Sequence, residues 1–201
     1  MPSKAHINLV EEPFEDCSQH VVISLTNEHG RSKEVRKLGV VSEVDVFEKI
    51  NSNERISLDN RYINDFSLAR YRDWAGLPID SDVTIHDFTA TNAYFDLENE
   101  IDFSHGVFVG SLSDLSHAVF ADGPLSFYHA KFNVDKVEFS SCHFGSGATN
   151  FQFAEFYTRH VGFDDVVFEN GDIQFISSVF GDAKISFKGA NFGDGKVDFH
   201  Y

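Results

Sequence analysis

The chain has 201 residues, of which 42% are hydrophobic, so it can bury a core and hold one or two domains. Its net charge of −16 argues against direct binding to nucleic acid or to an anionic membrane, because both need clustered Lys and Arg. No stretch approaches the roughly 18 apolar residues of a membrane span, and residues 1–16 lack a basic segment followed by an apolar run. We therefore expect a cytoplasmic protein without a membrane partner.

Residues 1–55 are expected to form a small α/β or β capping region. His20–Thr26 has the composition of a strand and is followed by the turn residues 27–30. Residues 41–50 fit either a strand or a short helix that begins near Ser42. Such a cap would cover the first rung of any repeat that follows, whose unpaired backbone groups would otherwise invite edge pairing.

Residues 56–100 contain a weakened form of a pattern that becomes regular later. The segment from Phe66 to Tyr71 keeps a spacing of five with Ala69 in the small position, and Ala93 precedes Phe95 by two. These features predict degenerate coils from about Ile56, as terminal repeats are usually atypical. Arg70, Arg72 and Trp74 form a basic and aromatic cluster that fits either an interaction spot or a satisfied boundary of the repeat.

Residues 101–201 follow a twelve-residue repeat. Large apolar residues recur at alternating spacings of five and seven, and 16 of the 17 positions are Phe, in a chain with 22 Phe and one Trp. These positions form the expected core ladder: Phe103, Phe108, Leu115, Phe120, Phe127, Phe132, Phe139, Phe144, Phe151, Phe156, Phe163, Phe168, Phe175, Phe180, Phe187, Phe192 and Phe199.

Three further positions keep the same period. Two residues before the first Phe of most units is an aliphatic residue, which is the alternation of a strand, with Ser113 and Thr149 as exceptions. Two residues before the second Phe is usually a small residue, which lets large neighbours pack closely. Asp-Gly or Asn-Gly pairs, such as 122–123, 170–171 and 194–195, predict turns in which Gly supplies a positive φ. Helix periodicity does not fit these offsets, so the repeat predicts an all-β solenoid.

The small residue followed two positions later by Phe resembles the unit of the pentapeptide-repeat proteins. The pairs Ala118 and Phe120, Ala130 and Phe132, Ala154 and Phe156, and Ala190 and Phe192 carry this resemblance, which covers about half of the chain. It implies a right-handed, roughly four-sided β-helix with an aromatic column along its axis. Every second step here is seven residues instead of five, a departure from the family's pattern.

Two coil lengths are compatible with this repeat. Two twelve-residue units form one coil of 24, or each unit forms a flattened coil of 12. We favour 24, because two Phe and an aliphatic residue would crowd the smaller perimeter. Residues 101–201 would then make about four rungs at about 4.8 Å each. The chain stops part-way through a unit, which favours a longer parent solenoid over an uncapped rung that self-associates end to end.

Candidate sites for chemistry are sparse. His105, His117 and His129 recur every twelve residues, but no carboxylate or thiol recurs beside them, so a solvated corner is preferred over a metal site. The segment 192–199 is similar to calcium-binding Gly-Asp repeats, although its period is wrong, and a plain turn is preferred. Asp164 and Asp165 form the one adjacent acidic pair of the repeats, without a catalytic partner.

The two cysteines are interpreted as separate thiols. Cys17 and Cys142 lie in different halves of the chain, and Cys142 occupies a small inward position and is expected to be core. No nucleophile-elbow, phosphate-binding or zinc-protease motif occurs. We therefore predict no catalytic, cofactor-binding or metal residues.

The function hypothesis from the sequence is a non-catalytic scaffold or protein–protein interaction module with an unknown protein partner. The alternative is a DNA mimic that binds a type II topoisomerase or another DNA-binding protein, as the resemblance suggests for an acidic rod. Residues 101–201 carry 13 acidic and 6 basic side chains, which is a thin charge density for such a mimic.

Overall fold

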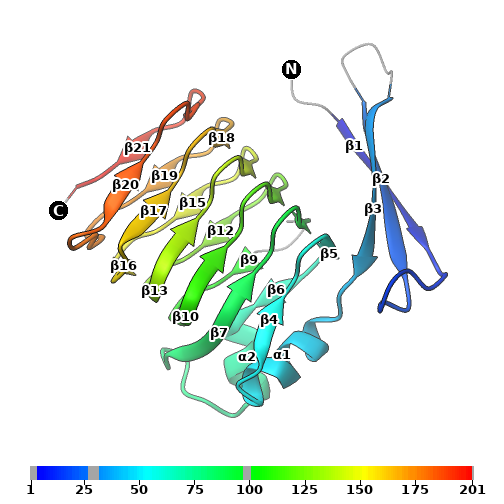
Figure 1. The fold of residues 1–201 in the computed structure, drawn as a ribbon, viewed down its shortest axis with the longest axis horizontal. Helices are drawn as coiled ribbons and strands as arrows, with labels where there is room; N and C mark the ends of the chain where they lie inside the picture. Colours follow the sequence, from blue (N-terminus) through cyan, green and yellow to red (C-terminus); the bar gives the residue numbers. More distant parts are fainter. Residues whose placement is uncertain (1–3, 27–31, 97–100, 201) are drawn as a thin grey trace.

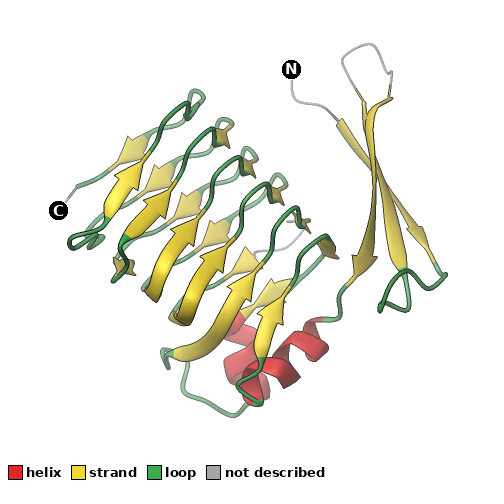
Figure 2. Ribbon diagram, in the orientation of Figure 1, coloured by secondary structure: helices red, strands yellow, loops and turns green. Residues whose placement is uncertain are grey.

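The computed structural model describes residues 4–26, 32–96 and 101–200. It describes their side chains too, except at residues 4, 25, 26 and 32–34. Three walls of parallel strands stack into a β-solenoid of about six turns (Figure 1). Both helices lie together at one end of the solenoid (Figure 2). No helix among the described residues is long and apolar enough to cross a membrane.

Each wall is built from strands that return to the same side once per turn. Wall 1 contains β5 (Arg61–Ile63), β8 (Tyr94–Phe95), β11 (Val119–Phe120), β14 (His143–Phe144) and β18 (Val167–Phe168). Wall 2 contains β4 (Arg55–Ser57), β7 (Val83–Thr89), β10 (Gly106–Asp114), β13 (Lys131–Glu138), β17 (His160–Gly162) and β20 (Lys184–Ser186), with β16 (Glu155–Phe156) also paired to β13. Wall 3 contains β6 (Phe66–Ser67), β9 (Ile101–Asp102), β12 (Leu125–Ser126), β15 (Thr149–Asn150), β19 (Ile173–Gln174) and β21 (Val197–Asp198).

The strand register fixes the coil at 24 residues. Phe108 pairs with Phe132 on wall 2, and the same interval separates the pairs on walls 1 and 3. The preferred coil of 24 is confirmed, and the flattened coil of 12 is wrong. A coil of this length has four inward positions for large side chains, which is the number that two twelve-residue units supply.

Stacked Phe rings fill the axis of the solenoid. In one column Phe103, Phe127, Phe151 and Phe175 follow one another at centroid distances of 4.9–5.0 Å with nearly parallel planes. Thirteen of the 17 ladder positions, from Phe103 to Phe175, are at most 2% exposed. Phe180, Phe187 and Phe192 in the last coil are only partly buried. Phe199 is 55% exposed, because no described coil covers it, so it lies outside the buried core that the sequence suggested.

The positive backbone angles that recur with the repeat lie at the corners and not at the Asp-Gly pairs. Residues two positions after the first large residue of each unit have φ between 53° and 60°, from His105 and His117 to Asp165 and Ser177. Gly123, Gly171 and Gly195 of the expected pairs, and Gly147 in the equivalent turn, have no positive φ, so the expected reason for glycine there is wrong. A Cβ at Gly147 would lie 1.7 Å from the carbonyl oxygen of Gly123 in the preceding coil. Glycine is required at this turn because successive coils pass too closely for any side chain.

Residues 68–74 depart from the expected degenerate coil. They form α2 (Leu68–Trp74), whose N-cap Ser67 accepts a hydrogen bond from the Arg70 amide through its side chain. Phe66 itself lies in β6 of wall 3. Phe66 pairs with Ile101 in wall 3, so the corner position equivalent to His105 falls on Arg70, where a left-handed backbone would cost about 1–2 kcal/mol. Leu68, Ala69 and Arg70 are instead good helix formers, so the chain turns into a helix here.

Two helices cover the first coil. The alternative of a short helix after Ser42 is confirmed by α1 (Glu43–Asn51), which buries Val46, Phe47 and Ile50. The ring of Phe47 lies 6.3 Å from Phe66 and 5.4 Å from Tyr71, so α1 and α2 close the aromatic core together. The cap therefore combines residues from both sides of position 55, since closing a wide coil takes more apolar surface than one short helix provides.

Among residues 4–26 and 32–40, three strands form an antiparallel sheet that does not cover the end of the solenoid. It consists of β1 (Lys4–Val10), β2 (His20–Thr26) and β3 (Ser32–Val40), and β3 joins it to wall 1 by pairing with β5 (Figure 1). The turn expected at residues 27–30 lies outside the described residues. Val21, Ile23 and Leu38 pack against Tyr62 and Tyr94 on the outer side of wall 1.

Candidate functional site

The histidine series separates into two corners. His105 and His129 stack at a centroid distance of 5.1 Å, one coil apart, and Phe153 continues the stack 4.8 Å beyond His129. His117 lies half a coil away, because twelve residues are half of the 24-residue turn. Partial burial, with further contributions from His129 and Arg72, lowers the pKa of His105. No group of three metal-binding side chains occurs among the described residues.

The acidic residues of the repeats serve neighbouring backbone groups. Asp164 accepts hydrogen bonds from the Ser186 hydroxyl and, at 2.9 Å, from the Lys188 amide in the next coil. The hydrogen bond from Ser186 lowers the pKa of Asp164. Asp198, in the segment similar to calcium-binding repeats, accepts from the His200 amide at 3.0 Å. These carboxylates cap turns, as Asx residues commonly do.

Cys142 lies fully buried in its small inward position, with its thiol 2.9 Å from the carbonyl oxygen of Leu115. Burial raises its pKa far above that of a free thiol, so it is a poor nucleophile. Cys17 is partly exposed, and neither it nor Cys142 forms a disulfide. Burial is the largest cause that raises the pKa of Cys17, and Arg61 opposes the shift.

The basic and aromatic cluster is a boundary of the solenoid. Arg72 is 3% exposed, donates to the backbone oxygen of Ser104 at 2.9 Å and lies 3.9 Å from Asp102. Arg70 binds Glu43 on α1 and also Asp65. Trp74 packs on Phe47. Of the two interpretations of this cluster, the contacts match the boundary, although the Nε atom of Arg72 is buried without a hydrogen-bond partner among the described residues.

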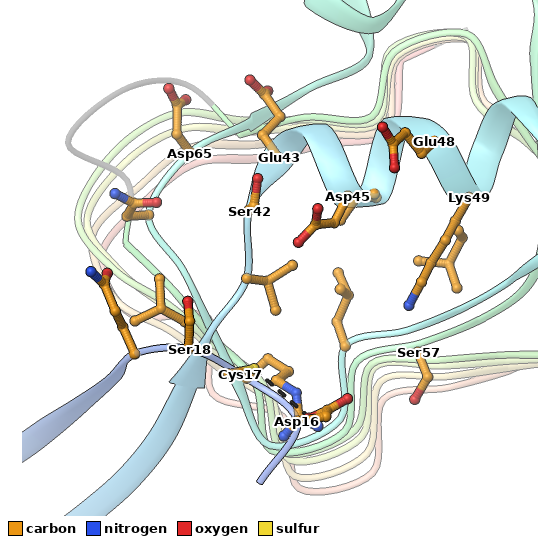
Figure 3. A pocket seen from close by; sticks show the side chains of 18 of the residues that line it. Asp16, Cys17, Ser18, Ser42, Glu43, Asp45, Glu48, Lys49, Ser57 and Asp65 are labelled. Atoms are coloured by element: carbon orange, nitrogen blue, oxygen red, sulfur yellow. Dashed lines mark hydrogen bonds and ion pairs between the residues drawn. The ribbon is translucent and has the colours of Figure 1, made fainter. Parts of the chain in front are cut away.

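A polar groove opens at the junction between the N-terminal sheet, α1 and the first coil, and we call it the junction groove (Figure 3). Its volume is about 1020 Å³. It is lined by the β1–β2 connection, the segment from β3 into α1, and residues of β4 and β5. The lining residues are Asp16, Cys17, Ser18, Gln19, Val40, Val41, Ser42, Glu43, Asp45, Val46, Glu48, Lys49, Ser52, Glu54, Ile56, Ser57, Leu58, Arg61, Asn64 and Asp65.

The charge of the junction groove is strongly negative, with six acidic and two basic side chains. One of the two cations is already engaged, because Arg61 binds Glu15 at 2.5 Å and Asp16 at 2.6 Å. In Figure 3, Asp45 and Lys49 point from α1 toward the opening. Asp45, Glu48 and Glu54 are exposed and make no ion pair with any residue that the structure describes.

The geometry of the groove follows from close packing at its base. A Cβ at Gly39 would lie 2.6 Å from the Cys17 sulfur, so the β1–β2 connection rests directly on β3. The Arg61 ion pairs then tie this connection to β5 of wall 1. These contacts hold the acidic connection beside α1 and leave the groove open between them.

Sequence reasoning did not find this groove. Its residues come from several segments between positions 16 and 65, and none of them carries a recognisable binding motif. Of the acidic residues concentrated at positions 11–16, only Asp16 lines the groove, so this concentration was no signal for it. Comparison of the chain with protein-family models, curated proteins and solved structures found no match.

Proposed function

We propose that this protein is a non-catalytic β-solenoid scaffold that binds a protein partner, and that a Lys- and Arg-rich segment of the partner occupies the junction groove. The observation that carries the proposal is the set of exposed carboxylates of Asp45, Glu48 and Glu54 on a groove of about 1020 Å³. A cationic chain would supply the ion pairs that these side chains lack. Complementary charge of this kind mainly sets the association rate and the choice of partner.

The solenoid is a rigid base for the junction groove, which supports this proposal. Its interior is filled by stacked rings, so the coils hold the groove residues of β4 and β5 at fixed positions. The repeat pattern motivates the further proposal that the chain is a variant of the pentapeptide-repeat proteins. Both cysteines are free, which favours a reducing compartment and thus the cytoplasm.

The charge on wall 2 gives no support to the DNA-mimic alternative. Lys131, Lys136 and Lys184 lie on its strands, and Lys131 and Lys136 bind acidic neighbours at 2.7 and 2.8 Å. A mimic of duplex DNA needs an unbroken run of negative charge, about one per 1.7 Å of its length. We therefore do not propose that function.

The test is the binding of a fluorescent Lys/Arg-rich peptide, measured by anisotropy at increasing salt, with an uncharged peptide of equal length as the reference. The triple variant Asp45→Asn, Glu48→Gln and Glu54→Gln should weaken binding about tenfold or more, since each exposed pair contributes up to about 1 kcal/mol. A control removes the same number of exposed charges elsewhere, through Asp80→Asn, Asp182→Asn and Asp194→Asn.

Two results would overturn the proposal. Equal weakening by both triple variants would show that the peptide responds only to the overall charge of −16. Absence of binding at low salt, where attraction between exposed charges is strongest, would remove the cationic partner altogether. Circular dichroism of each variant verifies that the fold is retained.

A further inference from the structure

The outer edge of β1 has no partner strand among residues 4–26, 32–96 and 101–200, in a sheet that is otherwise continuous. β1 is the terminal strand of an eight-stranded sheet, in the order β1-β2-β3-β5-β8-β11-β14-β18. All seven of its residues pair with β2 without a register shift, from Lys4 opposite Thr26 to Val10 opposite His20. In an antiparallel pair every second backbone amide and carbonyl of such a strand faces away from its partner. β1 therefore presents a straight row of free donors and acceptors.

This edge has few of the features that usually prevent strand addition. Within Lys4–Val10 there is no proline, no bulge and no acidic residue, and the one lysine lies at its first position, although the chain as a whole has a net charge of −16. Natural sheets protect long edges with charged residues, prolines or irregular pairing. Since the rest of the chain repels a second copy, β1 is a place where two copies can approach at little electrostatic cost.

The apolar face of β1 is incompletely covered. Ala5 and Ile7 pack against the cluster around Ile23, whereas Leu9, two positions further on the same face, is 53% exposed. The cluster continues to Tyr94, whose pKa is raised to about 12, first by burial and then by Asp96. Ala5 and Ile7 thus pack against a hydrophobic core, and Leu9 lies beside it, exposed to solvent.

We propose that β1 pairs antiparallel with β1 of a second copy and makes the protein a two-fold symmetric dimer. A pairing centred on Ile7 places Ile7 opposite its equivalent and Leu9 opposite Ala5 of the other copy. The same register places position 4, a lysine, opposite Val10 of the other copy. Backbone pairing and coverage of Leu9 then act together, as in other cases of strand addition.

Sedimentation velocity across the micromolar range tests the proposal. The expected result is a concentration-dependent dimer whose dissociation constant rises about tenfold or more with Leu9→Lys, because the charge is introduced twice per dimer. The control Val35→Lys changes a residue that is 60% exposed on β3, and it should shift the constant by no more than about threefold.

Amide hydrogen exchange identifies the interface independently. In the monomer, alternate amides of β1 should exchange rapidly, and they should become protected as the dimer forms. If Leu9→Lys fails to fold, Asn8→Glu offers a second exposed position on β1. A chain that stays monomeric, or a dimer in which the alternate amides of β1 still exchange rapidly, would overturn the proposal. Neither outcome affects the peptide test of the junction groove.

Discussion

Gly147→Ala should destabilise the solenoid far more than a typical Gly-to-Ala change. The added Cβ would lie 1.7 Å from the carbonyl oxygen and 2.1 Å from the carbonyl carbon of Gly123. Both atoms are backbone and cannot rotate away, so the two coils must separate by more than about 1 Å to reach an ordinary contact.

The size of the effect follows from the hydrogen bonds beside this turn. Leu125 donates to the oxygen of Ala148 at 3.0 Å, and Gly145 donates to that of Phe120 at 2.8 Å, and both bonds join the two coils that would have to separate. Losing or weakening two or three such bonds costs about 1 kcal/mol each, and overpacking adds about 1–3 kcal/mol. We expect a loss of about 3–5 kcal/mol in the free energy of unfolding, measured by urea denaturation.

Gly76→Ala is the matched control for this measurement. Gly76 has a φ of +67°, and a Cβ there would meet nothing within 4 Å. Its substitution should cost only the left-handed backbone penalty, about 1–2 kcal/mol. Conformational preference alone predicts the opposite ranking, because Gly147 has no positive φ. If Gly76→Ala were the more harmful change, the close approach of the coils would be refuted.

Three further outcomes are expected. Ser113→Ala should raise the free energy of unfolding by about 1 kcal/mol in urea denaturation, because the Ser113 hydroxyl is fully buried without a partner in the described structure; a loss of stability would contradict this. A thiol reagent should label Cys17 but not Cys142 in the native protein and both in denaturant, and native labelling of Cys142 would argue against its burial. The lowered pKa of His105 means that the unfolded chain binds its proton more readily, so stability should fall as the pH drops through about 6.5. His105→Asn, which tolerates the positive φ, should make this fall shallower in denaturation curves at several pH values, and an unchanged slope would disprove the assignment.

The sequence by itself determined the parts of the fold that repeat. A spacing of five and seven between Phe residues was enough to predict a β-solenoid, and a packing argument was enough to favour the 24-residue coil that the pairing of Phe108 with Phe132 confirms. The repeat makes this possible, because each coil packs against a coil of similar sequence, so the same residue types make the same contacts in every turn. The strand at His20–Thr26 was also readable, from its composition and the turn residues that follow.

Only the tertiary structure decided what happens where the repeat is interrupted. Local preference favours a helix after Phe66, but its use in closing the core depends on α1, whose Phe47 contacts Tyr71. The role of Gly147 depends on the distance to the next coil, which no local rule contains. The junction groove and the open edge of β1 arise from contacts between segments distant in sequence, such as Arg61 with Asp16. Contacts of this kind occur once and are not repeated along the chain, so the sequence pattern carries no trace of them.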